Sequence, residues 1–207
     1  MFDRWRGTIE RVTNLYDADA ARDIFDDLLT HYTCANRRYH DIRHIGFCLR
    51  QLDSVWGIAK QPDAIELAIW FHDVIYDSHR HDNEEQSALM ADDAMSQLGV
   101  ALPIAETVHS FILATRHNAP ATDADAAMMI DIDLAILGQP APVFDEYEAG
   151  VRFEYAWVPE STYRDGRSKI LKAFLDRTRI YAVDHFYQSL ESNARQNLAR
   201  SLANFAK

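Results

Sequence analysis

The spacing of apolar residues constrains the fold more than any other feature of this sequence. Ile45, Leu49, Leu52 and Trp56 recur three or four residues apart, which is the period of an amphipathic helix. The chain has only 7 glycines and 6 prolines, and they fall between such segments, where helices commonly end. No alternating strand pattern of useful length occurs. The sequence therefore predicts an all-α fold.

This pattern predicts nine helices in one domain. They cover approximately Asp19–Tyr32, Asp41–Ile58, Pro62–Ile75, Asn83–Leu98, Pro103–Thr115, Asp123–Leu137, Val143–Trp157, Thr162–Tyr181 and Asp184–Phe205. With 48% hydrophobic residues, a chain of 207 residues can form a large core. We expect residues 1–207 to form a single helical bundle, with its core at about 19–140 and a C-terminal cap of helices at 141–207.

Charge and composition limit the partners and the compartment. A net charge of −11 argues against nucleic-acid backbones and anionic membranes as general partners. No apolar run approaches the length of a membrane span, and the first residues lack the apolar region of a signal peptide. Cys34 and Cys48 match no zinc motif, so we expect both to be small buried residues. A cytoplasmic protein is the expectation, and a homodimer stays open.

One apolar segment carries charge where a core helix would not. In Trp70–Asp77, "WFHDVIYD", His72 and Asp73 stand side by side among aromatic and aliphatic residues. Burying an ionised carboxylate there costs several kcal/mol, roughly, unless a cation, a salt-bridge partner or a hydrogen-bond network compensates it. We expect the doublet to lie on the helix, where adjacent side chains diverge by about 100° and both can still reach one ion over the helix flank.

Two further segments place metal-capable groups among apolar residues. His40 and His44, in "YHDIRHI", are four residues apart and share a face if the segment is helical. Asp131 and Asp133, in "MMIDIDLAILG", are acids inside an apolar run. Imidazole together with carboxylate suits Mn²⁺, Fe²⁺, Zn²⁺, Co²⁺ or Ni²⁺, and suits Mg²⁺ less well. These three segments therefore offer candidate ligands for a single divalent transition metal.

These motifs resemble the HD-domain superfamily of metal-dependent phosphohydrolases, whose signature is H…HD…D. More closely, the chain resembles a bacterial group of predicted HD-superfamily metal-dependent phosphohydrolases. The resemblance extends from about Tyr32 to Leu198. It rests on "YHDIRHI", "LAIWFHDVIYD", "DNEEQSA", "DIDLAILG", "VRFEYAWV", "YRDGR" and "ARQNL". It implies a metal-activated water that attacks a small phosphorylated substrate, with a nucleotide among the candidates.

The resemblance implies a set of metal ligands, position by position. These are His44, His72, Asp73 and Asp133, with Asp131 as the other candidate for the last place. Because Asp131 and Asp133 would point about 200° apart on a regular helix, only one of them is expected to face the ion. Some members of the superfamily bind a second metal through further histidines, and His109 and His117 lie in the corresponding interval.

Other residues are candidates for catalysis and substrate binding. Asp77 and Glu84 are candidates to position or deprotonate the water, and His117 is a candidate to face the substrate. Asn83 and Glu85 leave helix capping open as another role for the segment around Glu84. The candidate substrate-binding residues are His40, whose imidazole could contact the substrate, and Arg43, Arg152 and Arg167, whose guanidinium groups would match a phosphate. Ordinary surface ion pairs and helix packing are the alternatives for each of them.

Two other functions remain open at this stage. The chain could hold a metal or a ligand without turnover, or it could be a di-iron oxygenase of the same fold with two irons per chain. The sequence lacks the signatures that we associate with (p)ppGpp hydrolases and cyclic-dinucleotide phosphodiesterases. The substrate and the native metal are therefore not predicted.

Overall fold

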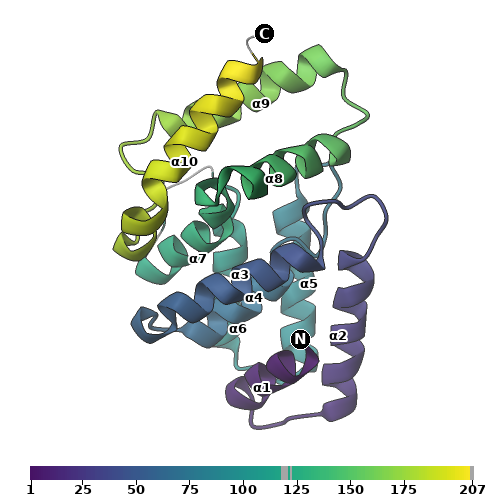
Figure 1. The fold of residues 1–207 in the computed structure, drawn as a ribbon. Coiled ribbons are helices and arrows are strands. Elements are labelled where there is room, and N and C mark those ends of the chain that lie inside the picture. The colour runs from purple at the N-terminus through teal and green to yellow at the C-terminus, as the bar shows by residue number, and fades with distance from the viewer. Residues whose placement is uncertain (118–120, 122, 206–207) are drawn as a thin grey trace. The chain divides into compact units, whose positions relative to one another are not determined.

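The computed structural model describes residues 1–117, 121 and 123–205, and it confirms the all-α prediction. The described residues form helices and connecting turns, with no strands (Figure 1). The α-helices are α1 (Phe2–Val12), α2 (Ala18–Tyr32), α3 (Ile42–Val55), α4 (Pro62–Phe71), α5 (Asn83–Gln97), α6 (Leu102–Ala114), α7 (Ala124–Leu134), α8 (Ala141–Glu154), α9 (Glu160–Leu175) and α10 (Asp184–Phe205), and two short 3₁₀ helices are η1 (Trp56–Ile58) and η2 (Ala135–Gly138).

The chain separates into two compact units, Met1–Ile130 and Asp131–Lys207. The sequence placed the change from core to C-terminal helices at about residue 140, ten residues later. The difference arises because the last turns of α7, together with η2, pack with the C-terminal helices: η2 contacts both α8 and α10. The prediction that the whole chain is a single domain remains a prediction.

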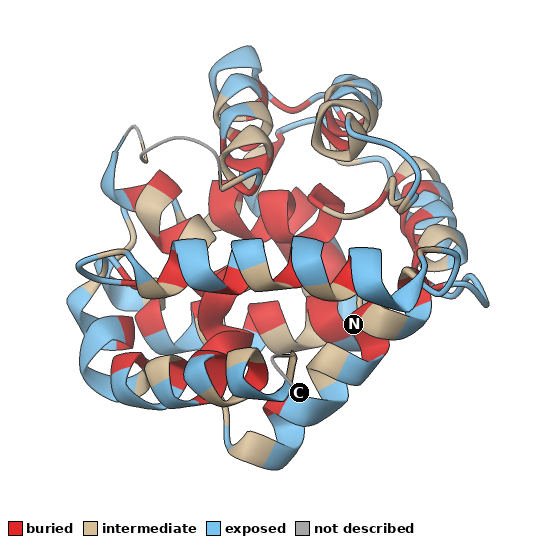
Figure 2. Cartoon of the chain, turned by 90° about the horizontal axis from the view of Figure 1, so that it is seen from above, coloured by how far each residue is buried: buried red, intermediate tan, exposed pale blue. Residues whose placement is uncertain are grey.

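Helix α4 is the centre of the first unit. Every residue from Ala64 to Phe71 is buried, and α4 packs against α1, α3, α5 and α6. Figure 2 shows the consequence, since buried residues line the inner faces of the helices and exposed residues the outer faces. A helix that is apolar on all sides needs such a cover of neighbouring helices. The end of α4 is therefore enclosed by other elements, and the His72–Asp73 doublet follows it directly.

Helix α1 was not predicted, because charges are spread through the first residues of the chain. Its inner face is nevertheless apolar: Trp5 and Ile9 are fully buried, and the Trp5 ring meets that of Trp70 edge to face at 5.9 Å. The side chains of Arg4 and Thr8 bind the buried carboxylate of Glu66 on α4, at 2.9 and 2.7 Å. This polar contact joins α1 to the central helix.

Helix α4 ends four residues earlier than expected. It stops at Phe71, because side chains from other elements bind the backbone that follows. Ser87 on α5 exchanges hydrogen bonds with Ile75 (3.1 and 3.3 Å). Asn83 binds the backbone N–H and C=O of Asp77 (3.1 and 3.0 Å). The expectation that the doublet lies within the helix was therefore wrong.

Helix α9 also ends early, at Leu175 instead of Tyr181. In this second unit the Arg195 guanidinium of α10 donates to the carbonyls of Leu175, Arg177 and Thr178 (2.8–3.1 Å). Glu191 accepts hydrogen bonds from the backbone N–H of residues 180 and 181. These contacts replace the hydrogen bonds that a longer helix would make, and α9 and α10 lie side by side (Figure 1).

The second unit also requires a glycine at the turn after α7. A Cβ atom at Gly138, in η2, would lie 2.5 Å from the Cβ of Leu190 on α10. Asn197 donates to the carbonyls of Leu137 and Gln139 (2.9 and 2.8 Å). The close approach of η2 and α10 therefore depends on the absence of a side chain at Gly138.

In the described part of the chain, no single helix has both the length and the apolar character needed to cross a membrane. One bent pair, Ala124–Gly138 with Ala141–Glu154, meets the length and composition requirement when its two members are taken together.

Candidate metal centre

Three predicted ligands of the first unit meet at the end of α4. His44 lies in the first turn of α3, His72 caps the C-terminus of α4, and Asp73 follows it. The Nε2 atoms of the two histidines are 3.1 Å apart. The Oδ2 atom of Asp73 lies 3.2 Å from Nε2 of His72 and 3.5 Å from Nε2 of His44. We call His44, His72 and Asp73 the triad.

The spacing of the triad fits one metal ion. Two ligand atoms that are each about 2.1 Å from an ion lie about 3.0 to 3.5 Å from one another, for bond angles between about 90° and 110°. All three separations within the triad are in or next to this range. Both imidazoles are buried, whereas the side chain of Asp73 is 17% exposed. The carboxylate is thus the side of the triad from which solvent can reach an ion.

The hydrogen bonds of His72 prepare it to bind a metal. Its Nδ1 atom lies 2.9 Å from the carbonyl oxygen of Ile69. Since a carbonyl only accepts, we assign the ring proton to Nδ1, which leaves the lone pair on Nε2. Metal-binding histidines commonly show this arrangement, in which a backbone carbonyl orients the ring and fixes its tautomer.

The surroundings of Asp73 keep its carboxylate ionised. Burial raises the pKa of this carboxyl group, but the electrostatic effect of the surrounding imidazoles of His72, His40 and His44 outweighs burial and lowers the pKa below its ordinary value. A carboxylate that is ionised at neutral pH is the form that binds a cation. The surrounding histidines thus explain electrostatically how an ionised carboxylate is tolerated in this apolar segment.

Asp133 is carried by α7, whose first turn is tied to the start of α4. The buried carboxylate of Asp125 accepts hydrogen bonds from the backbone N–H of Lys60 and Gln61 (2.7–3.1 Å). From this anchor, α7 continues without a break to Leu134. Asp133 lies in the last turn of this helix.

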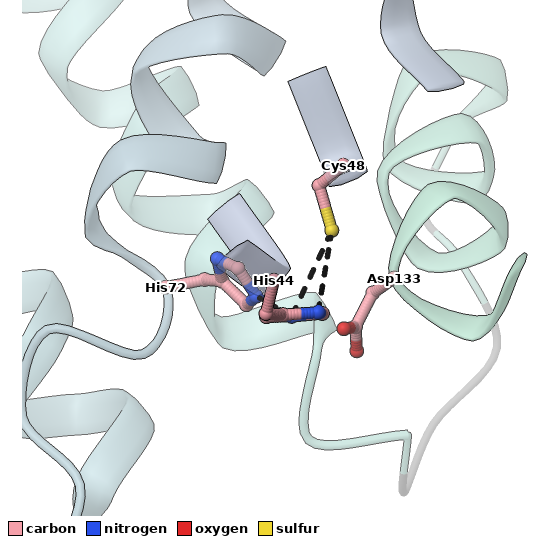
Figure 3. A group of neighbouring side chains, drawn as sticks. All are labelled: His44, Cys48, His72 and Asp133. Atoms are coloured by element: carbon pink, nitrogen blue, oxygen red, sulfur yellow. Dashed lines mark hydrogen bonds between the residues drawn. The ribbon is translucent and has the colours of Figure 1, made fainter. Parts of the chain in front are cut away.

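Two of the triad residues also belong to a group of side chains that includes Asp133 and the thiol of Cys48. His44, Cys48, His72 and Asp133 each offer one ligand atom, and these atoms all lie within 4.8 Å of one another (Figure 3). This group of mostly buried side chains could hold a metal ion. The identity of the ion does not follow from the residues, because imidazole, carboxylate and thiolate together suit several transition metals.

Cys48 was not predicted as part of the cluster. It lies one turn after His44 on α3, so both side chains are on the same face of the helix. Its Sγ atom is nearly equidistant from the two ring nitrogens of His44, 3.8 Å from Nδ1 and 3.7 Å from Nε2. The sulfur thus lies beside the ring and away from the lone-pair direction of Nε2, so it would have to rotate to share an ion with that nitrogen. Cys34, also expected to be buried, is exposed.

Asp131, the other candidate for the last ligand, has a structural role in the second unit. It is fully buried, and its two oxygens accept hydrogen bonds from the backbone N–H of Ala182 (3.1 Å) and Val183 (2.6 Å). Burial raises the pKa of this carboxyl group to about 6, against the opposing effect of those two hydrogen bonds. Its oxygens are thus already used by the backbone that leads into α10.

The candidate catalytic residues lie around the segment that follows α4. Asp77 is exposed, and its carboxylate accepts hydrogen bonds from the backbone and ring of His79 (2.9 and 3.0 Å), which lower its pKa. Glu84 is half-buried in the first turn of α5. His117 follows the end of α6 with a φ of 55°, a left-handed conformation that is uncommon for a residue other than glycine. Their catalytic roles remain predictions.

Two of the candidate substrate-binding residues lie in the first unit. The ring of His40 stacks on that of Tyr76 at 4.1 Å, and its centroid is 6.1 Å from that of His44. Arg43, on the exposed side of α3, binds the carboxylate of Asp41 and the carbonyl of Arg38. His40 is therefore next to the triad, and Arg43 helps to cap the start of α3.

The other two, Arg152 and Arg167, lie in the second unit. Arg152 pairs with Glu160 at 3.0 Å and donates to two backbone carbonyls. Arg167 is buried, where it binds the carboxylate of Glu148 and the hydroxyl of Tyr147. Each guanidinium thus has an intramolecular partner, and phosphate binding by either one remains a prediction.

His109 and His117 are the histidines that a second metal site would need, although a single metal is expected. His109 pairs with the partly exposed carboxylate of Asp92 at 2.8 Å. This contact between α6 and α5 gives His109 a structural role that needs no metal. Among the described residues, one cluster of side chains could hold a metal ion, and it is the cluster that contains His44 and His72.

A buried arginine beside the triad was also missed. Arg37, 8% exposed, donates hydrogen bonds to backbone carbonyls on both sides of the triad. Its partners are backbone atoms, two of which lie 36 and 37 residues away in the sequence, and no spacing signal could have found them. For Cys48, the signal was present, because it stands four residues after a predicted ligand.

The chain was compared with protein-family models, with curated proteins and with solved structures, and none of the three comparisons found a significant match.

Proposed function

We propose that this protein is a metal-dependent phosphohydrolase that acts on a small phosphorylated compound, with nucleotides among the candidate substrates. The observation that carries the proposal is the triad, in which two imidazole nitrogens and one carboxylate oxygen from separate segments lie 3.1 to 3.5 Å apart. The resemblance of the ordered motifs to the HD-domain superfamily supports the same conclusion.

The proposed metal ligands are the triad and Asp133. Two imidazoles with one or two carboxylates suit Mn²⁺, Fe²⁺, Zn²⁺, Co²⁺ or Ni²⁺, and three or four protein ligands leave positions open for water and substrate. When bound there, a divalent ion would lower the pKa of a water molecule and polarise a phosphoryl oxygen. The buried imidazoles hold one side of the site, and the partly exposed Asp73 marks the side that a phosphate could approach.

The other candidate residues have separate proposed roles. His40, whose ring stacks on that of Tyr76, is proposed to donate a hydrogen bond to a phosphoryl oxygen. Glu84 is the better candidate to accept a proton from water, because the hydrogen bonds from His79 lower the pKa of Asp77 and make it a weaker base. His117 and Arg43 are proposed to contact the substrate.

The test measures metal content and phosphate release on the same preparations. Protein purified without chelator or histidine tag is expected to contain about one transition metal per chain, and Asp73→Ala much less. Asp176→Ala is the matched control, since it makes the same aspartate-to-alanine change at an exposed carboxylate outside the cluster, and it should retain the metal. Wild type should release phosphate from part of a broad panel of phosphoesters, and Asp73→Ala should not.

Other outcomes distinguish the alternative functions. Metal in the wild type without phosphate release would indicate a protein that binds a metal or ligand without turnover. Two irons per chain would favour a di-iron oxygenase. No metal after reconstitution with Mn²⁺, Zn²⁺ and Ni²⁺ would mean that the triad is buried polar structure and that the proposal is wrong.

A further inference from the structure

Arg37 is a buried arginine that forms three hydrogen bonds beside the triad. It lies between α2 and α3, where it is 8% exposed. Its Nη1 atom donates to the carbonyl oxygens of His40 (3.1 Å) and Asp73 (2.6 Å), and its Nη2 atom donates to that of Val74 (2.7 Å). All three partners are backbone oxygens. The guanidinium therefore fixes the position of the main chain and does not occupy the metal-binding atoms of the triad side chains.

These partners belong to the two segments that carry the triad. His40 precedes the first turn of α3, in which His44 lies, and Asp73 and Val74 follow the end of α4. A single nitrogen, Nη1, reaches both segments. The contact therefore sets the distance between the two main chains at the place where the triad forms.

The end of α4 explains why a buried cation is stable at this point. The last carbonyls of a helix lack intrahelical partners, and the helix dipole makes this end negative. The hydroxyl of Tyr32 binds one of these carbonyls, that of Trp70, at 3.0 Å. Arg37 binds the carbonyls just beyond, so the negative end of the helix compensates its charge.

Two aromatic rings hold the guanidinium in place. Its Cζ atom lies 5.2 Å from the ring centroid of Tyr32 and 5.7 Å from that of Tyr76, distances typical of cation–π contacts. A guanidinium is a rigid planar fork that can serve several carbonyls at fixed angles, whereas an ammonium is a compact charge on a flexible chain. The site thus requires the geometry of arginine as well as its charge.

We propose that Arg37 is a positioning residue that presets the spacing of His44, His72 and Asp73 for metal binding by clamping the backbone of both segments. It touches neither metal nor substrate. The inference rests on the metal site of the proposed function and is independent of the reaction that the site catalyses.

The experiment compares the affinity for Co²⁺, by competition with a chelator, in wild type, Arg37→Lys and Arg37→Gln. Removing residues that support metal ligands typically weakens binding about 10- to 100-fold, and both variants should fall in this range. The visible absorption spectrum of bound Co²⁺ should also change, because it reports the angles between ligands. Arg4→Gln is the control: it removes another arginine of the same unit and lowers stability, but it should keep the affinity and the spectrum of wild type.

The results separate a failure of this inference from a failure of the proposed function. If wild type binds Co²⁺ and Arg37→Lys binds it equally well with the same spectrum, the positioning role is wrong and the metal site stands. If wild type does not bind Co²⁺, both are wrong. If Arg4→Gln weakens binding as much as the Arg37 variants, lost stability accounts for the effect and the positioning role is again wrong.

A measurement on the wild type covers the case in which the Arg37 variants do not fold. The clamp predicts that the Arg37 side-chain N–H protons exchange slowly with solvent in the metal-free protein, as observed by NMR. Fast exchange without metal would show that the clamp is not preformed, and it would overturn the inference.

Discussion

At the scale of single residues, Asp131 and Asp73 show how the environment gives two buried acids different roles. Histidines surround Asp73 and lower its pKa, which keeps it available for a cation. Asp131 has backbone N–H groups as partners, and burial dominates, so its pKa rises to about 6. The same residue type therefore serves as a metal ligand candidate in one place and as a backbone cap in another.

The raised pKa of Asp131 predicts a pH dependence of stability. Between about pH 4 and pH 6 the folded chain binds the Asp131 proton more tightly than the unfolded chain does, so the contribution of this residue to stability falls as the pH rises through this window. A shift of about two pKa units corresponds to about 3 kcal/mol. The difference in unfolding free energy between wild type and Asp131→Asn should fall by about 2 to 3 kcal/mol from pH 4 to pH 7, as measured by urea denaturation.

The control for this prediction is Asp176→Asn, which changes an exposed carboxylate of the same unit. The difference between wild type and Asp176→Asn should stay nearly constant over the same pH range. A flat profile for Asp131→Asn as well would show that the buried carboxyl titrates alike in the folded and unfolded chains.

The residues of the candidate site were predictable to different degrees. His44, His72 and Asp73 were predicted because histidines and acids in apolar segments are conspicuous in a sequence and because their order resembles a known ligand pattern. Arg37 was not found, since its role depends on carbonyl groups that any residue type supplies. A side chain that binds side chains leaves a pattern in the sequence, whereas one that binds backbone does not.

At the scale of helices, local signals predicted the starts of α2 to α10 to within two residues, but they missed the ends of α4 and α9 by four and six residues. Pro62 marks the first turn of α4, and Gly99, with a φ of 67°, follows α5. The expected start of α10 at Asp184 is confirmed. The early ends of α4 and α9 depend on side chains distant in sequence, such as Asn83 and Arg195. Tertiary contacts of this kind override helical periodicity and are invisible in a local window.

The contact between α1 and α4 provides a test at this scale. Arg4→Ala would leave the buried Glu66 with Thr8 as its remaining recorded partner, and removing one member of a buried ion pair costs about 3 to 5 kcal/mol. Because Arg4 is 28% exposed, we expect a loss of about 2 to 4 kcal/mol in unfolding free energy. Arg11→Ala removes a more exposed pair with Asp63, also between α1 and α4, and should cost about 1 kcal/mol or less.

Urea denaturation measures the loss in unfolding free energy for the two variants. Equal losses would mean that the buried pair of Arg4 and Glu66 contributes no more to stability than the exposed pair of Arg11 and Asp63. A loss confined to Arg4→Ala would show that α1, the helix absent from the sequence prediction, is held to the central helix mainly through the buried carboxylate.

At the scale of the whole molecule, metal binding should stabilise the unit that contains the triad. A ligand that binds only the folded state at 100 times its dissociation constant adds about 2.7 kcal/mol. Three of the 4 tryptophans, Trp5, Trp56 and Trp70, lie in Met1–Ile130. The exposed Trp157 lies in the other unit, so the fluorescence of Trp157→Phe reports on the triad-containing unit.

The measurement is the urea midpoint of Trp157→Phe fluorescence with and without a saturating transition metal. We expect the metal to raise the midpoint and a chelator to restore it, while Asp73→Ala in the same background should show little change. An equal response in the Asp73→Ala variant would place the metal elsewhere on the chain.

The buried carboxylate of Glu66 has a consequence before the molecule is folded. It is the single charged residue between Ala64 and Phe71, in a segment that is otherwise apolar. Segments of this kind can pair between unfolded chains and aggregate, and an interrupting charge opposes this pairing. We expect Glu66 to oppose this pairing while the chain is unfolded, before α1 has packed against the segment. The residue that joins two helices in the folded protein would then also limit self-association of the unfolded chain.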